Sequence, residues 1–225
     1  QRWPVPRDSS ETRARLLAEA ERLFASSTIH QVTNREITEA AGQKNASALN
    51  YHFGSRGDLL LEILRAHGNE LDAERGRRGA HLDVGSPTVD IIAALVEPYG
   101  AKLGDPSGRN YLTIVDQLRE QIGQWRIGPA AGDVHLQRLL EILLGRPRGL
   151  PVEVREQRLL SMMLLMVAAM AARAREIESG AQPALDHDAF VANLTDMLVG
   201  VIEAPTSGDH AHPVAAGLQA AGPAT

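Results

Sequence analysis

Apolar residues recur at steps of three and four along most of the chain, which is the spacing of one face of an α-helix. Within residues 9–26 this spacing is kept by Leu16, Leu17, Ala20, Leu23 and Phe24. A strand would need apolar and polar positions to alternate, and no segment does so convincingly. The pattern therefore predicts an all-α fold.

Two short helices are predicted after the first one. Thr33 to Glu36 has the spacing of a capping box, in which the two side chains bond to each other's backbone N–H groups. Gly42 ends the helix that this box opens, because glycine readily adopts the left-handed conformation of a C-terminal cap. A second short helix is predicted over residues 46–52, with Asn45 as its N-cap.

The remaining helices are longer. One is predicted from Ser55 to about residue 78, and another starts with Ser86 as N-cap and Pro87 in the first turn. Pro98 is expected to kink or end that helix, because proline lacks the backbone N–H. Others are predicted along the apolar stripe 111–125, over 134–144, over 152–178 and from Asp186 onward.

Composition and charge narrow the function classes. Cysteine is absent, which excludes disulfides and thiolate chemistry and is compatible with a cytoplasmic protein. The longest apolar run, residues 159–172, is too short to span a bilayer and predicts a buried helix. The net charge is −5, yet the first 60 residues hold eight basic and seven acidic side chains. A nucleic-acid contact would therefore be a local patch near the N-terminus.

The stretch 33–56 has the pattern of a helix-turn-helix: a capped helix, a short turn with glycine and a second short helix. The second helix of this motif enters the DNA major groove, which explains why so many polar side chains crowd onto it. Asn45, Ser47 and Asn50 suit base edges, whereas Lys44, Arg35 and Arg56 suit phosphates. Tyr51 and His52 either donate to phosphates or pack within the bundle, and Leu49 and Phe53 are predicted core residues.

The segments Thr33-x-Arg35-Glu36-Ile37, Ala41-Gly42 and Leu49-x-Tyr51-His52-Phe53-x-Ser55-Arg56 resemble the N-terminal domain of TetR-type transcriptional regulators. The resemblance covers residues 12–61 and implies a homodimer that binds a palindromic operator, with repression relieved by a small molecule. Six residues separate Gly42 from Leu49, where the family pattern has five, and Asn50 replaces the usual first tyrosine. Asn50 therefore either reads a base or contacts a phosphate.

Residues and resemblance together predict which positions contact DNA. By position, Asn34 and Arg35 begin the second helix, where the family touches DNA, and Arg56 occupies a phosphate-binding position. The full set is Thr33, Asn34, Arg35, Lys44, Asn45, Ser47, Asn50, Tyr51, His52 and Arg56.

The predicted organisation is a flexible N-terminus (1–8), a three-helix DNA-binding domain (9–58), a larger helical ligand-binding and dimerisation domain (59–204) and a disordered tail (205–225). The predicted pocket residues are Tyr99, Tyr111, Gln121, Trp125, Met163 and Met166. Plain core packing is the alternative for Trp125, and a place on a dimer or core helix is the alternative for the methionines. The last two helices are predicted to form the dimer interface through Leu160, Leu164, Val167, Phe190, Leu194, Met197, Leu198 and Val201.

The predicted function is a repressor released by a hydrophobic or amphipathic ligand. The alternatives are a regulator of the same family that senses no ligand or activates transcription and, more remotely, a helical-bundle enzyme. No nucleophile–base motif supports an enzyme, and no cofactor is implied. His210 and His212 are the only close histidine pair and lack a third ligand, so no metal site is predicted, and His67 is expected at the surface or at a helix end.

Overall fold

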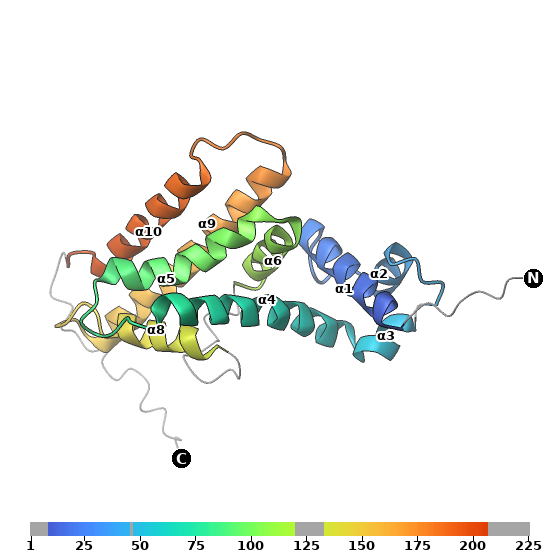
Figure 1. Ribbon diagram of the computed structural model, residues 1–225, viewed down its shortest axis with the longest axis horizontal. Helices are drawn as coiled ribbons and strands as arrows, with labels where there is room; N and C mark the ends of the chain where they lie inside the picture. The colour runs from blue at the N-terminus through green and yellow to red at the C-terminus, as the bar shows by residue number, and fades with distance from the viewer. Residues whose placement is uncertain (1–8, 46, 120–132, 207–225) are drawn as a thin grey trace, which may run out of the picture.

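The computed structural model describes residues 9–45, 47–119 and 133–206, and within these ranges all regular structure is helical. The helices are α1 (Ser9–Ser26), α2 (Asn34–Ala40), α3 (Ala48–Phe53), α4 (Arg56–Gly79), α5 (Thr88–Ala101), the 3-10 turn η1 (Lys102–Gly104), α6 (Pro106–Gln117), α8 (Val134–Leu144), α9 (Val152–Glu178) and α10 (His187–Glu203). Figure 1 shows an elongated molecule with α1–α3 at one end, α5 and α8–α10 at the other, and α4 running between them. The predicted all-α fold is confirmed.

Helix limits agree with the sequence pattern where a clear apolar stripe meets clear flanking signals. The predicted limits of α1, α8 and α9 coincide with the observed ones, and Asp186 caps α10 as expected. Pro98, in contrast, lies inside α5, which continues to Ala101 before it tightens into η1. Proline near the last turn removes only one hydrogen bond, and burial of Pro98 and its neighbours holds the helix together.

The start of α5 also differs from the prediction. Pro87 is its N-cap, and Ser86 belongs to the preceding turn, where its N–H lies 3.1 Å from the Asp83 carboxylate. The N–H of Gly85 donates to the same carboxylate at 2.8 Å. Asp83 therefore organises this turn and takes the serine that would otherwise cap the helix.

The buried apolar residues form two cores. The smaller one joins α1, α2, α3 and the first half of α4, with Leu16, Phe24, Ile37 and Leu49 fully buried. The larger one joins the second half of α4 to α5, α6, α8, α9 and α10. Helix α6 contributes to both, because Ile114 and Leu118 pack in the smaller core while Tyr111, Leu112 and Val115 pack in the larger.

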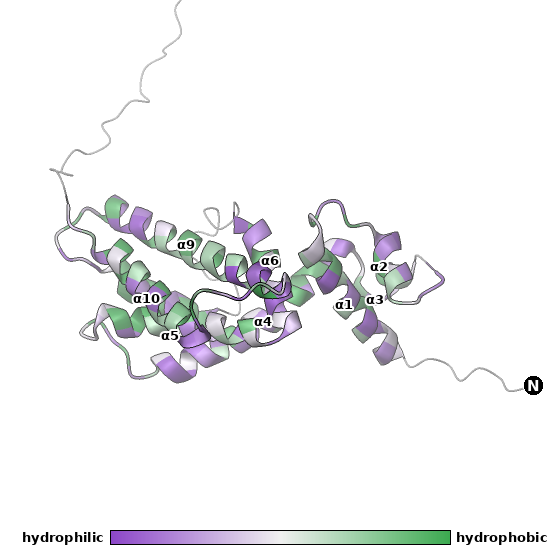
Figure 2. Ribbon diagram, turned by 90° about the horizontal axis from the view of Figure 1, so that it is seen from above, coloured by the Kyte–Doolittle hydropathy of each residue, from purple (hydrophilic) through white to green (hydrophobic). Residues whose placement is uncertain are grey.

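Hydrophobic positions gather along α5, α9 and α10 in Figure 2, and these helices enclose the larger core. Met162, Met166 and Met170 of α9 are buried there, which fits the core alternative for the methionine cluster; Met163 is half-buried. Across the described parts of the chain, no helix combines the length and the apolar character needed to cross a membrane.

Some predictions concern positions outside the described residues. These are the pocket residues Gln121 and Trp125, the N-terminal segment 1–8, the tail from residue 207 and the pair His210 and His212.

Candidate nucleic-acid interface

The predicted capping box is present at the start of α2. The Glu36 N–H donates to the Thr33 hydroxyl at 3.2 Å, and the Thr33 N–H donates to the Glu36 carboxylate at 2.7 Å. This backbone hydrogen bond lowers the pKa of Glu36 below its ordinary value. The Thr33 hydroxyl also donates its only proton to the same carboxylate, at 2.8 Å. Thr33 is thus a cap and, in this conformation, has no proton to donate to a phosphate.

Gly42 ends α2 for a reason that the backbone makes clear. Its φ is +68°, in the left-handed region that residues other than glycine rarely adopt. The Gln43 N–H donates to the Thr38 carbonyl at 2.8 Å, and the Gly42 N–H donates to the Glu39 carbonyl at 3.0 Å. This pair of bonds is a Schellman motif, which turns the chain sharply toward α3.

The start of α3 differs from the prediction. The Asn45 side chain accepts from the Ser47 N–H at 2.9 Å, and the Asn45 carbonyl accepts from the Ala48 N–H at 3.0 Å. Asn45 therefore closes a small turn two residues before the helix and is not the N-cap that we predicted. The N-cap is Ser47, so α3 begins at Ala48 rather than at residue 46.

Helix α3 is held by its apolar side and presents its polar side to solvent. Leu49 and Phe53 are buried in the smaller core, as predicted. Asn50 is exposed, and Tyr51 is 81% exposed, which excludes the bundle-packing alternative for this tyrosine. The His52 ring packs edge-on against Tyr51 at 5.0 Å and is half-buried.

The other predicted DNA-contact residues gather on the same surface. Lys44, Asn45 and Ser47 are exposed. Asn45 and Ser47, together with Tyr51 and His52, line a hollow between α3 and the start of α1. Arg35 is 80% exposed and pairs with Glu39 at 2.6 Å; this hydrogen bond raises the pKa of Arg35. A phosphate would have to compete with Glu39 for the Arg35 guanidinium.

Arg56 has a structural role that sequence reasoning missed. Its Nη1 donates to the Ile29 carbonyl at 3.2 Å and also to the Val32 carbonyl. Both carbonyls belong to the loop between α1 and α2, so Arg56 ties this loop to the start of α4. Any phosphate contact would use the remaining guanidinium N–H groups.

We expect Arg56→Ala to destabilise the protein by about 1.5 to 3 kcal/mol, because hydrogen bonds from a charged group to the loop carbonyls are lost. Chemical denaturation measures this change. The matched control is Arg35→Ala, which removes an exposed guanidinium from the same domain and should leave stability almost unchanged. Equal stability of the two variants would contradict the structural role of Arg56.

Arg13 is a second residue that the sequence did not single out. Its guanidinium lies 4.7 Å from the centre of the Phe53 ring and pairs with Glu62 at 2.5 Å. One side chain of α1 thereby contacts both α3 and α4. These contacts help to fix the recognition helix against its support.

A family model decides what this motif is: the model described as "Bacterial regulatory proteins, tetR family" matches residues 16–63. Residues 16–63 thus form a DNA-binding domain of the TetR family. The matched segment runs from α1 into the first third of α4 and contains every residue of the helix-turn-helix.

Solved structures extend the likeness to the whole fold of this TetR-type chain. NalD of Pseudomonas aeruginosa, the secondary repressor of the MexAB-OprM multidrug efflux pump, has a TM-score of 0.55 and 18% identity over 84% of this chain and 96% of its own. A TetR-family regulator of Streptomyces coelicolor has a TM-score of 0.50 and 17% identity over 89% and 99%. At such identities the likeness concerns the fold alone. No curated protein matches the chain significantly.

The TetR-type domain is joined to the larger helical domain by polar contacts that sequence reasoning also missed. The Gln117 side chain of α6 accepts from the Ile29 N–H at 2.8 Å and donates to the carbonyls of Phe24 and Ser27 at 2.7 and 3.1 Å. These partners are 88 to 93 residues away in the sequence, so no local pattern indicates them. Gln117 thus fastens the end of α6 to the end of α1.

His67 forms the second link. Our prediction of a surface or helix-end position was wrong, since its side chain is only 12% exposed and lies in the middle of α4. Its Nδ1 lies 3.1 Å from the Lys102 ammonium, which can only donate, so the imidazole proton is on Nε2. Nε2 therefore donates to the buried Glu21 carboxylate of α1 at 3.0 Å. The His67 ring stacks on Tyr111 of α6 at 4.6 Å.

The predicted pocket residues that the structure describes are mostly buried, whereas the predicted dimer-interface residues divide into buried and partly exposed ones. Tyr99, Tyr111 and Met166 are buried in the larger core of the TetR-type regulator. Val167, Leu194 and Leu198 are also buried within the protomer, which leaves them no surface to offer a second chain in this conformation. The remaining predicted interface residues keep exposed surface: Leu160, Leu164, Phe190 and Val201 are half-buried, and Met197 is 46% exposed.

Proposed function

We propose that this TetR-family regulator is a cytoplasmic repressor that binds a palindromic operator as a homodimer and is released by a small hydrophobic or amphipathic effector. The observation that carries the proposal is the surface of α3, where Lys44, Asn45, Ser47, Asn50 and Tyr51 are exposed beside one another while Leu49 and Phe53 anchor the helix. Exposed amides and hydroxyls on a short, rigidly held helix suit the major groove. NalD is itself a repressor, which makes repression the first form of regulation to test.

Dimer formation through α9 and α10 is supported by the exposed surface of Leu160, Leu164, Phe190, Met197 and Val201. Two such helix pairs packed about a two-fold axis would bury this surface in a four-helix interface. A dimer would place its two recognition helices about one DNA turn apart, roughly 34–36 Å. Binding to a palindrome then depends on how the two DNA-binding domains are held.

An effector in the larger domain would act through α6 and α4. Tyr111 stacks on His67, which donates to Glu21 of α1, and Gln117 holds the end of α1 from the far end of α6. A ligand that displaces Tyr111 would therefore move groups that fix the orientation of the DNA-binding domain. The effector must bind the DNA-incompetent dimer more tightly than the competent one, because equal affinity shifts no population.

The test is a selection of DNA from a random-sequence pool, followed by fluorescence anisotropy over a range of salt concentrations. We expect a palindrome to be enriched, to bind a dimer far more tightly than random DNA, and to show a steep negative salt dependence. If nothing is enriched, native mass spectrometry shows whether a co-purified small molecule holds the induced state. A ligand-free protein that enriches no sequence would contradict the proposal.

The second candidate is a regulator of the same family without a ligand response, or an activator. The anisotropy assay separates these functions, because only an effector-controlled protein changes its operator affinity when the effector is added. A reporter gene placed behind the selected operator gives the sign of regulation.

We expect Asn50→Ala to change sequence preference rather than overall affinity. An amide can bind adenine through two hydrogen bonds, worth about 1 to 3 kcal/mol of discrimination at one base pair. Repeating the selection with the variant, beside Val84→Ala in an exposed loop of the larger domain as a control, measures the effect. A uniform loss of affinity for all sequences would instead assign Asn50 to a phosphate.

A further inference from the structure

Arg75 of α4 is a buried cation for which the described residues provide no hydrogen-bond acceptor. The residue is 3% exposed, and its Nε has no hydrogen-bond partner within residues 9–45, 47–119 and 133–206. Among the described residues, no carboxylate forms an ion pair with it. A charge removed from water without such a pair is unfavourable unless other groups compensate it.

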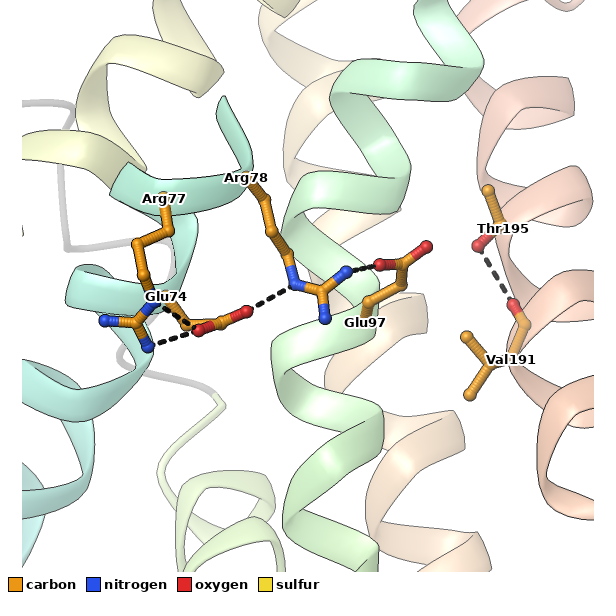
Figure 3. Close-up of polar contacts among 6 residues, drawn as sticks. All are labelled: Glu74, Arg77, Arg78, Glu97, Val191 and Thr195. Carbon is orange, nitrogen blue, oxygen red and sulfur yellow. Dashed lines mark hydrogen bonds and ion pairs between the residues drawn. The ribbon is translucent and has the colours of Figure 1, made fainter. Parts of the chain in front are cut away.

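Two neighbouring arginines of α4 differ from Arg75, because their guanidinium groups form ion pairs. In Figure 3, Glu74 lies between Arg77 and Arg78 and bonds to both, and Arg78 also reaches Glu97 of α5. Both arginines are exposed, Arg77 to 68%. Arg75, in contrast, is buried and forms no ion pair with a carboxylate of the described residues.

Two aspartates near Arg75 do not neutralise it. Asp72, one turn earlier on α4, accepts from the backbone N–H groups of His135 and Leu136 at 3.2 and 2.8 Å and so caps the start of α8. Asp133 is near enough to interact with Arg75 electrostatically: burial raises the pKa of its carboxyl, the charge of Arg75 lowers it, and the charge of Asp72 raises it. Neither aspartate forms an ion pair with the guanidinium.

The aromatic ring of Tyr99 lies close to the Arg75 guanidinium. The Arg75 guanidinium carbon lies 5.4 Å from the centre of the Tyr99 ring, and Tyr99 packs against Tyr111 at 6.3 Å between ring centres. Burial raises the pKa of Tyr111 well above its ordinary value, and a hydrogen bond with Tyr99 also raises it, so the Tyr111 hydroxyl stays protonated. Both tyrosines belong to the larger core together with Met166 and Met170. A buried cation thus adjoins aromatic and apolar walls.

We propose that Arg75 anchors the effector, and that the effector is an amphipathic carboxylate whose anionic group pairs with the guanidinium while its apolar body packs against Tyr99 and Tyr111. The fork of the guanidinium matches a carboxylate, and such a pair is strongest where water is excluded. The inference rests on the proposed function, because it identifies the class of molecule that acts on the regulator. A ligand at this site would contact Tyr111 and could shift it, and Tyr111 is linked through the stacked His67 ring to Glu21.

The test compares charged and uncharged forms of the same molecules on the full chain. Thermal unfolding is followed with sodium decanoate, sodium 4-phenylbutyrate and sodium indole-3-acetate, each beside its primary amide. We expect at least one carboxylate to raise the melting temperature with an apparent Kd at least ten-fold tighter than that of its amide. Arg75→Met should weaken that carboxylate at least ten-fold. A panel in which no carboxylate exceeds its amide, or a response that Arg75→Met retains, overturns the proposal.

The matched control is Arg77→Gln, which removes the same charge from the exposed side of the same helix and should leave the carboxylate response unchanged. Without ligand, Arg75→Met should melt at or above the wild-type temperature, because an uncompensated buried charge is removed. A marked drop in melting temperature would identify Arg75 as a structural residue and overturn the proposal.

Operator binding, measured by anisotropy on the same samples, separates this inference from the proposed function. Suppose the protein binds an operator and is released only by uncharged or cationic molecules, which act equally on Arg75→Met. The repressor function is then supported and the carboxylate assignment is wrong. If carboxylates bind through Arg75 but no specific DNA is found, the carboxylate site stands and the repressor function fails.

Discussion

Tyr51→Ala is expected to weaken operator binding by about 30- to 150-fold while leaving the fold intact. Tyr51 is 81% exposed, so its removal costs little packing. A lost hydrogen bond to a phosphate is worth about 1 to 1.5 kcal/mol, and a dimer on a palindrome carries the change twice. The resulting loss of about 2 to 3 kcal/mol corresponds to the stated factor.

Fluorescence anisotropy on the selected operator and on random DNA measures the Tyr51 effect. Because a phosphate contact carries no sequence information, both DNAs should lose affinity by a similar factor. Tyr51→Phe separates the hydroxyl from the ring, and Val84→Ala, an exposed apolar side chain far along the chain, is the control. If Tyr51→Ala binds within two-fold of wild type, this end of α3 does not contact DNA.

Gly108→Ala is expected to destabilise the protein by about 3 kcal/mol or more. A Cβ atom at Gly108 would lie 2.1 Å from the carbonyl oxygen of Lys102, far inside contact distance. The obstacle is backbone, so either η1 or the first turn of α6 must move. Tyr111 lies one turn further along α6, and its packing against Tyr99 and His67 would be lost with that movement.

Chemical denaturation of the purified variants measures the Gly108 effect. Gly104→Ala is the matched control, because a Cβ there meets no atom within 4 Å although the residue lies in the adjoining η1. We expect Gly104→Ala to remain close to wild type. A Gly108→Ala protein of normal stability would show that η1 yields to the added methyl group without cost.

Sequence reasoning succeeded where the determinants are local. The capping box at Thr33 and Glu36, the glycine stop at Gly42 and the limits of α9 all follow from residues a few positions apart. It failed where two local signals compete. Ser86 is a good N-cap by type, yet Asp83 draws it into a turn, and Asn45 likewise forms a turn of its own instead of capping α3.

The candidate site follows the same division. Exposure of Asn50, Tyr51 and the residues before them was predictable, because α3 has one apolar side and the rest must face solvent. The long-range contacts of Arg13, Gln117 and His67 were not, since their partners lie 35 to 93 residues away. A buried arginine without an ion pair is equally hard to predict from a sequence, because it is defined by which residues surround it in the fold.

The packing of α6 into both cores determines how the protein is expected to unfold. Ile114 and Leu118 complete the smaller core, although they lie more than fifty residues beyond the helix-turn-helix. A fragment ending at residue 58 would expose the surface that these two side chains cover. We therefore expect calorimetry to record one cooperative transition for the whole chain, and the excised N-terminal segment to be largely unfolded.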